Sequence, residues 1–192
     1  MVKIAIIYHS GFGHTQVQAE AVAQGVNAVE GAQAQLVKAD EIIDHLESLS
    51  SLDGMIFGSP TYMGSVSAPF KAFMDASSKI WFQQGWKDKV AAGFTNSHSL
   101  SGDKLNSLIQ MTIFAMQHGM IWVGQAEPNQ SPDGQPGKPD AINRMGSTLG
   151  AMAQSENQDP AITPPAGDLK TAELLGTRVA QITLQLRSNQ SH

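Results

Sequence analysis

A segment near the N-terminus that is rich in glycine and hydroxyl side chains has the residue types of a phosphate-binding loop. The sequence S-G-F-G-H-T at 10–15 lies between an apolar run at 2–8 and an amphipathic stretch. Backbone N–H groups at a helix start attract anions, the two glycines allow close approach to the backbone, and the hydroxyls add donors. Gln16 stands where the dinucleotide pattern G-x-G-x-x-G requires glycine. The segment therefore predicts a site for the phosphate of a mononucleotide or, alternatively, a tight structural turn.

Apolar runs that alternate with helical patterns are the elements that must position this loop. Five runs predict strands, at 2–8, 34–37, 54–58, 89–94 and 120–123. Apolar residues at helical spacing predict the helices between them. One of these helices, capped by Ser101, has the predicted core residues Leu105, Leu108, Ile109, Thr112, Ile113 and Met116. The alternation predicts a three-layer α/β domain, with helices on both faces of a parallel sheet.

Ligands bind in such domains at the carboxyl ends of the strands. The loops expected there are 10–15, 59–64 and 95–102. The stretch 124–165 is rich in Gly, Pro, Gln and Asn, and we expect it to be a long loop that serves a site. We expect a single domain over residues 1–187, with a final helix that begins at Asp168, and a flexible tail at 188–192.

The composition excludes several classes of function. The 12 Lys and Arg residues against 17 Asp and Glu residues give a net charge of −5, so the basic surface that nucleic-acid binding requires is missing. Cysteine is absent, which removes disulfides, thiolate chemistry and zinc fingers, and we expect no metal site. The first apolar run is too short for a signal peptide, and no apolar stretch is long enough to span a membrane. We therefore expect a cytoplasmic protein with no membrane partner.

The residues of the first two loops resemble those of a known family. The run Ile6-Ile7-Tyr8-His9-Ser10-Gly11-Phe12-Gly13-His14-Thr15, with Ala19 and Val22, is similar to the FMN-phosphate pattern of flavodoxins. Four further segments resemble those of the WrbA-type NAD(P)H:quinone oxidoreductases and NADPH-dependent FMN reductases. They are Gly58-Ser59-Pro60-Thr61-Tyr62-Met63-Gly64, Phe73-Met74-Asp75, Trp81 and Gln117-His118-Gly119-Met120. The resemblance spans residues 2–124 and includes the final helix. It implies a flavodoxin-like fold whose five-stranded parallel sheet has the order 2-1-3-4-5.

The resemblance also implies an FMN site built from the three loops. The residues implied in phosphate binding are Ser10, Gly11, Phe12, Gly13, His14 and Thr15. Those implied along the edge of the isoalloxazine ring are Pro60, Thr61, Tyr62, Met63 and Gly64, and those on its pyrimidine side are Thr95, Asn96, Ser97, His98 and Gly102. His118 would reach the flavin, and Phe12, Trp81 and His118 would border the nicotinamide and quinone site. Without the resemblance, His118 would be interpreted as a helix cap.

The activity implied is that of an FMN-dependent oxidoreductase that takes hydride from NAD(P)H and passes electrons to a quinone or similar small acceptor. No acid or base residue is required, because the flavin does the chemistry. Two departures from the family are Tyr62-Met63 in place of Arg-Phe and a short connection from Asp40 to Asp53. The alternative is a flavodoxin-type one-electron carrier to protein partners, which would use a strongly acidic docking face. A regulatory flavin sensor is a third interpretation.

Three aromatic residues within six positions have several possible roles. Trp81, Phe82 and Trp86 are candidates for the core, for a subunit interface or for a wall of the substrate site. A flavin face bordered by Phe12 and Trp81 predicts completion by a neighbouring subunit. We therefore expect a homodimer or homotetramer.

Overall fold

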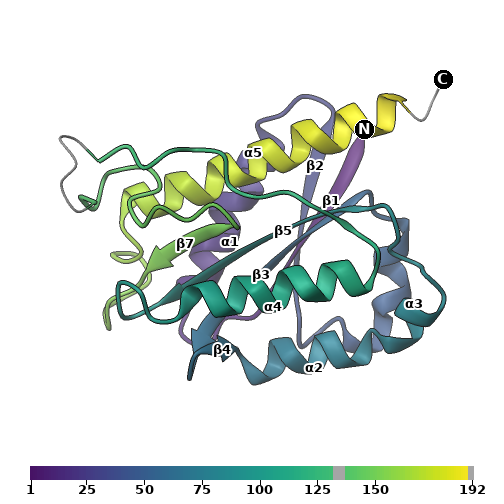
Figure 1. Ribbon diagram of the computed structural model, residues 1–192, viewed down its shortest axis with the longest axis horizontal. Coiled ribbons are helices and arrows are strands. Elements are labelled where there is room, and N and C mark those ends of the chain that lie inside the picture. The colour runs from purple at the N-terminus through teal and green to yellow at the C-terminus, as the bar shows by residue number, and fades with distance from the viewer. Residues whose placement is uncertain (132–136, 190–192) are drawn as a thin grey trace.

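The computed structural model describes residues 1–131 and 137–189, and its centre is a parallel sheet (Figure 1). The strands lie in the order β2 (Ala32–Lys38), β1 (Val2–Tyr8), β3 (Gly54–Tyr62), β5 (Val90–Ser97) and β6 (Ile121–Trp122). Ile6 of β1 lies beside Leu36 of β2 and Ile56 of β3, and Ile56 in turn lies beside Ala92 of β5. The short strand β4 (Ser65–Val66) pairs with β3 and lies off this path, so β5 and β6 are the fourth and fifth strands of the main sheet. This order confirms the predicted α/β flavodoxin-like fold and its strand order 2-1-3-4-5.

Helices cover both faces of the sheet (Figure 1). One face carries α1 (His14–Asn27) and α5 (Ala166–Asn189), and the other carries the 3-10 helix η1 (Ile43–Ser51), α2 (Ala68–Ala76), α3 (Ser78–Phe82) and α4 (Lys104–Gln117). Side chains of a strand alternate between the faces. Ile6 accordingly packs in one core with Val22 and Val179, and Ile7 packs in the other with Phe70 and Leu108.

The fifth position of the sheet is shared by two strands. β6 pairs with Val90 and Ala91 at the start of β5, and β7 (Ala151–Gln154) pairs in parallel with the end of β5 from Phe94 onward. The chain leaves the sheet between them, and the indole N–H of Trp122 donates a hydrogen bond to the carbonyl of Leu149 at 2.9 Å. The expectation of one uninterrupted loop over 124–165 is therefore corrected, because β7 lies within it.

The core face of α4 differs from the predicted one. The buried residues are Lys104, Ser107, Leu108, Met111, Phe114 and Ala115. Of the predicted core residues, Leu105, Ile109, Ile113 and Met116 are 40–56% exposed. Apolar residues lie around most of this helix, and Phe114 faces the sheet because its ring packs against Phe57 and Phe73 of the aromatic core. Leu108 is the one predicted core residue that is buried, so the prediction was right for this residue and wrong about which face of the helix meets the sheet.

The ends of two helices also differ from expectation. The N-cap of α4 is Asp103, with φ 58°, and not Ser101, whose carbonyl accepts the Lys104 N–H at 3.1 Å. The helix α5 continues through Asn189, beyond the predicted end at 187, and residues 190–192 of the predicted tail lie outside the described residues. Within the described part of the chain, no helix is both long enough and apolar enough to cross a lipid bilayer.

Candidate functional site

The three predicted loops meet where β1, β3 and β5 end, and they surround a cavity of about 380 Å³. In Figure 1 this edge of the sheet lies near β4 and the tip of β7. The loops contribute to its wall Phe12, His14, Thr61, Tyr62, Asn96, Ser97 and His98. The rest of the wall is Ser155, Glu156 and Asn157, which follow β7. The parallel sheet therefore brings together loops that are far apart in the sequence.

The first loop is a fixed glycine turn at the start of α1. The Ser10 hydroxyl oxygen accepts hydrogen bonds from the backbone N–H groups of Gly13 at 3.1 Å and Gln16 at 3.2 Å. Gly13 has a φ of 91°, a conformation that side chains disfavour. Thr15 is buried, and its Oγ1 accepts a hydrogen bond from Nδ2 of Asn96 at 2.8 Å. The first loop is thus joined to the third.

The second loop is a β-hairpin that places an aromatic side chain on the cavity wall. Its two-residue turn, Met63–Gly64, has positive φ at both positions, 50° and 77°, as hairpins of this length favour. The turn projects into solvent and Pro60 is buried in β3, so these positions do not line the cavity. Tyr62 lies edge-on to the exposed ring of Phe12, with 6.4 Å between the ring centroids, and partial burial raises the pKa of Tyr62. Phe12 and Tyr62 form an accessible aromatic wall.

The third loop contains residues that shape it and residues that face the cavity. Thr95 is fully buried, and its hydroxyl oxygen lies 2.8 Å from that of Thr61, which is also 2.8 Å from that of Ser107. Gly102 has a φ of 53°, and a Cβ there would lie 2.1 Å from Oγ of Ser97. Thr95 and Gly102 therefore hold the loop in position, whereas the side chains on the cavity wall are those of Asn96, Ser97 and His98.

Residues 155–160 close the cavity on the side of β7. The backbone N–H of Ser155 donates to the carbonyl of Ser97 at 2.9 Å, and Nε2 of His14 lies 2.8 Å from the carbonyl of Gln158. Among the residues that the structure describes, none forms a hydrogen bond with the buried hydroxyl of Ser155. An unpaired buried polar group costs free energy, so this hydroxyl is a candidate ligand-binding group. The composition of the segment predicted only a loop that serves a site, and no residue pattern pointed to Ser155, Glu156 or Asn157.

A buried ion pair braces the third loop. Nε and Nη2 of Arg144 donate to the two carboxylate oxygens of Asp168, at 2.7 and 2.9 Å, and both side chains are more than nine-tenths buried. Nη2 of Arg144 also donates to Oε1 of Gln154 at 3.1 Å, and Nε2 of Gln154 donates to the carbonyl of His98 at 3.2 Å. The segment between β6 and β7 is thereby connected to the loop that forms the cavity.

A buried lysine holds the same loop from α4. Lys104 is fully buried, and its Nζ donates to Oγ of Ser97 and to the carbonyl of Ser99, both at 2.8 Å. Burial disfavours the charged form and lowers the pKa of Lys104 to about 8, so the side chain is still largely protonated at pH 7. No sequence pattern points to this residue, because a lysine in a helix is usually on its solvent face.

The structure does not bring His118 and Trp81 to the three loops. His118 follows the last residue of α4, which runs antiparallel to the strands for 14 residues, about 21 Å. The N–H of Asp88, just before β5, donates to the carbonyl of Gly119, so His118 lies near the opposite edge of the sheet. Trp81 lies in α3, in the segment that leads to the start of β5 at this same edge, and its side chain is 44% exposed. Within one chain these two residues do not line the cavity, and their contact with the ligand stays a prediction.

His118 is instead part of the aromatic core. Its ring is 4.4 Å from the ring of Trp86 between centroids, and its Nε2 lies 2.9 Å from the hydroxyl oxygen of Ser77. The side chain is buried, and burial lowers the pKa of His118 to about 4. Trp86 is fully buried and stacks on Phe73, so of the three clustered aromatics this one belongs to the core.

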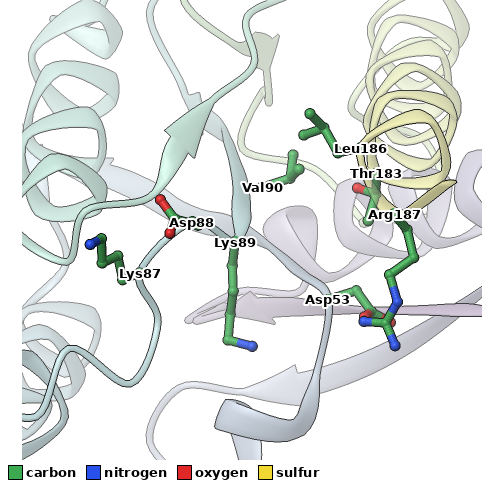
Figure 2. Close-up of a pocket in the computed structure, with 8 residues that line it drawn as sticks. All are labelled: Asp53, Lys87, Asp88, Lys89, Val90, Thr183, Leu186 and Arg187. Carbon is green, nitrogen blue, oxygen red and sulfur yellow. The ribbon is translucent and has the colours of Figure 1, made fainter. Parts of the chain in front are cut away.

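A second, smaller cavity lies at the opposite edge of the sheet (Figure 2). Its wall combines Lys87, Asp88 and Lys89 before β5 with Asp53 and Arg187, which form an ion pair. Nζ of Lys89 donates to the carbonyl of Leu52 at 2.6 Å. None of the three predicted loops reaches this cavity. Among the described residues, no three or more His, Asp or Glu side chains are grouped as metal ligands would be.

Comparisons with known proteins agree with this geometry. A family model described as NADPH-dependent FMN reductase matches residues 8–131. A protein from Pseudomonas aeruginosa named flavodoxin FldP is 45% identical, over 98% of this chain and 100% of its own length. An NAD(P)H dehydrogenase (quinone) from Archaeoglobus fulgidus is 31% identical, over 97% and 100%. The crystal structure of a WrbA-like flavodoxin from Agrobacterium tumefaciens superimposes with a TM-score of 0.75 and 40% identity, over 96% of this chain and 99% of that one.

Proposed function

Since the chain belongs to the NADPH-dependent FMN reductase family and is an FMN-binding, flavodoxin-like redox protein, we propose that it is an NAD(P)H:quinone oxidoreductase. The observation that carries this proposal is the exposed aromatic wall of Phe12 and Tyr62, which borders the cavity of about 380 Å³ that the three loops form for the cofactor. Exposed rings beside the cofactor can hold a small planar substrate by contact with its faces or edges.

The residues of the three loops fit FMN. The turn at 10–15 offers the start of α1 to a phosphate, and Ser10 and Gly13 keep that turn in place. We assign the phosphate to Ser10–Thr15, the edge of the ring to Thr61 and Tyr62 of the second loop, and its pyrimidine side to 96–98. The unpaired hydroxyl of Ser155 is a further group that a bound cofactor would satisfy.

FMN held by these loops would supply two-electron chemistry, in which a hydride taken from the nicotinamide is passed on to the quinone together with one proton from solvent. The protein has three tasks in this reaction. The first loop binds the phosphate, and Phe12 and Tyr62 orient the planar substrates by contact with their faces or edges. The third loop, next to the start of α4, presents positive potential to the ring.

A one-electron carrier is the second candidate, because the relative with 45% identity is named a flavodoxin. Two features of this chain favour the enzyme. The net charge is only −5, and Glu156 is the single carboxylate on the cavity wall, because the loops 10–15, 59–64 and 95–102 contain none. A carrier that docks on basic partners would need acidic side chains near its cofactor.

Steady-state kinetics of the FMN-loaded protein tests the proposal. We expect NADPH or NADH oxidation with benzoquinone as acceptor, and parallel lines in double-reciprocal plots, because donor and acceptor would use the same place beside the cofactor in turn. The control is the same protein freed of FMN, which should be inactive. Negligible turnover together with a stable one-electron-reduced form would instead establish the carrier.

We also propose that the protein is a homodimer or a dimer of dimers. Leu105, Ile109, Ile113 and Met116 form an exposed apolar row along the whole of α4. Two such rows packed antiparallel would bury each other, which fits a two-fold interface. This arrangement would also bring the end of α4 in one copy, next to Ser77 and α3, towards the cavity of the other. Trp81 would then border the substrate site from the second copy.

A charge on this row should separate the copies. We expect Ile113→Glu to give a monomer by light scattering at micromolar concentration, because a carboxylate at the centre of an apolar contact loses its hydration. Gln181→Glu is the control, since Gln181 is exposed on α5, which covers the other face of the sheet. A wild-type protein that is itself monomeric at this concentration would contradict the proposed assembly.

A further inference from the structure

The buried lysine of α4 contributes a charge that no carboxylate neutralises. Within the described part of the chain, Lys104 makes no ion pair, and its Nζ is hydrogen-bonded only to the third loop, at Ser97 and Ser99. The charged groups that act on it are Asp168 and Arg144, which are already paired with each other. The three side chains together carry one net positive charge in the protein interior. A buried charge of this kind is unfavourable unless something else stabilises it.

The position of this charge relates it to the cavity. Ser97, whose Oγ accepts the hydrogen bond from Lys104 at 2.8 Å, is itself part of the cavity wall. One residue therefore separates the ammonium group from the space assigned to the pyrimidine side of the ring. Arg144 reaches the same loop through Gln154 and the carbonyl of His98. The net positive charge of Lys104, Arg144 and Asp168 thus lies beside the part of the site where reduction of the ring places negative charge.

We propose that Lys104 is a positioning residue that stabilises the reduced, negatively charged form of the bound flavin. The inference rests on the proposed function for the place of the ring, and it deepens it. Lys104 acts in two ways, because it fixes Ser97 and Ser99 in the loop and supplies a positive charge in a medium where such charges are weakly screened. The negative charge of the reduced cofactor would neutralise the buried positive charge that stays unneutralised in the free protein.

A purely structural role for Lys104 predicts a different result, and Lys89 provides the comparison. Lys89 is half-buried in the wall of the second cavity (Figure 2). Its Nζ donates to the carbonyl of Leu52 at 2.6 Å. Burial lowers the pKa of Lys89, as it does for Lys104. The two lysines therefore share burial and a hydrogen bond to a loop carbonyl, but Lys89 lies at the edge of the sheet away from the three loops. Removal of either should lower stability, and removal of Lys104 alone should affect the flavin.

The experiment compares Lys104→Met with Lys89→Met in the FMN-loaded protein. The dissociation constants of oxidised and reduced FMN, and the midpoint potential of the bound cofactor, are measured at one pH and one ionic strength. A unit charge about 10 Å away, at an effective dielectric constant of about 20, changes an equilibrium about tenfold. We therefore expect Lys104→Met to weaken the binding of reduced FMN about tenfold more than the binding of oxidised FMN. This difference equals a midpoint potential lower by about 30 mV for two electrons.

The control variants separate charge from structure. Lys104→Arg keeps the charge and should retain a potential close to that of the wild type. Lys104→Gln removes the charge but keeps a donor for Ser97, so it gives the same test if the methionine variant does not fold. Lys89→Met should lower the melting temperature and leave the potential unchanged. An unchanged potential in both neutral variants of Lys104, or an equal change in Lys89→Met, would overturn the inference.

The two levels of the proposal fail separately. The potential can be measured by chemical or photochemical reduction, without a nicotinamide or a quinone. If the wild type shows no NAD(P)H:quinone turnover but the neutral Lys104 variants lower the potential, the proposed function is wrong and the role of Lys104 stands. If turnover is present and the potential does not respond to the charge, the role of Lys104 is wrong and the proposed function stands.

Discussion

Gly13→Val is expected to weaken FMN binding by about 100-fold or more. The φ of 91° at Gly13 disfavours any side chain, and a Cβ there would lie 2.6 Å from Cγ of Pro160. Either the turn or residues 155–160 must move, and the N–H groups at the start of α1 then lose their alignment with the phosphate. Two lost charge-assisted hydrogen bonds of about 1.5 kcal/mol each correspond to more than 100-fold in Kd. Fluorescence titration of the cofactor-free protein with FMN measures the loss.

Two comparisons show whether the phosphate is the reason. Riboflavin lacks the phosphate, so the wild type should bind it much more weakly than FMN, and Gly13→Val should change riboflavin binding little. Gly31→Val is the matched variant, because Gly31 also has a positive φ, 85°, but lies before β2 at the opposite edge of the sheet. It should lower stability and leave FMN binding unaltered. Equal losses for FMN and riboflavin in Gly13→Val would rule out the first loop as the phosphate site.

Acidification from pH 7 to pH 4 is expected to destabilise the wild type by about 3 kcal/mol more than a His118→Gln variant. Burial lowers the pKa of His118 from its ordinary value of 6.5 to about 4 in the folded protein. Between these values the unfolded chain binds the extra proton, so the contribution is fully present above pH 6.5 and is lost as the pH falls through 4. At about 1.4 kcal/mol per pKa unit, the difference is worth about 3 kcal/mol.

Denaturant unfolding at several pH values measures this effect. Glutamine at position 118 can still hydrogen-bond to Ser77 but does not titrate in this range, so the variant should have a flatter dependence of stability on pH. His45→Gln is the control, because His45 is exposed and its replacement should leave the wild-type dependence intact. If the His118→Gln and wild-type profiles are parallel, the imidazole is accessible to protons in the folded protein.

The layers of the fold were predictable because they depend on patterns that the sequence contains. Strands buried on both sides must be apolar throughout, and Val2–Tyr8 was predicted to the residue. The orientation of α4 was not predictable, since a helix with apolar residues on several faces does not specify which one meets the sheet. The buried face includes Lys104 and Ser107, whose side chains find polar partners only after the third loop has been placed.

The candidate site divides in the same way. The three loops could be predicted, because the carboxyl ends of neighbouring parallel strands must converge on one edge. The contribution of Ser155, Glu156 and Asn157 could not, because it depends on a strand that leaves the sheet and returns. His118 was assigned to the ligand by resemblance alone. Within one chain, the antiparallel course of α4 places it in the aromatic core.

The division of the fifth strand has a consequence for how proteins of this shape diversify. β6 and β7 each pair with β5 through their own backbone ladder, so the sheet stays continuous whatever lies between residues 123 and 150. That excursion supplies Arg144 to the third loop, and β7 delivers residues 155–157 to the cavity. Changes in its length or composition can therefore alter the wall of the cavity while the scaffold is conserved. A library randomised between the two strands would be an economical route to redox proteins of new specificity.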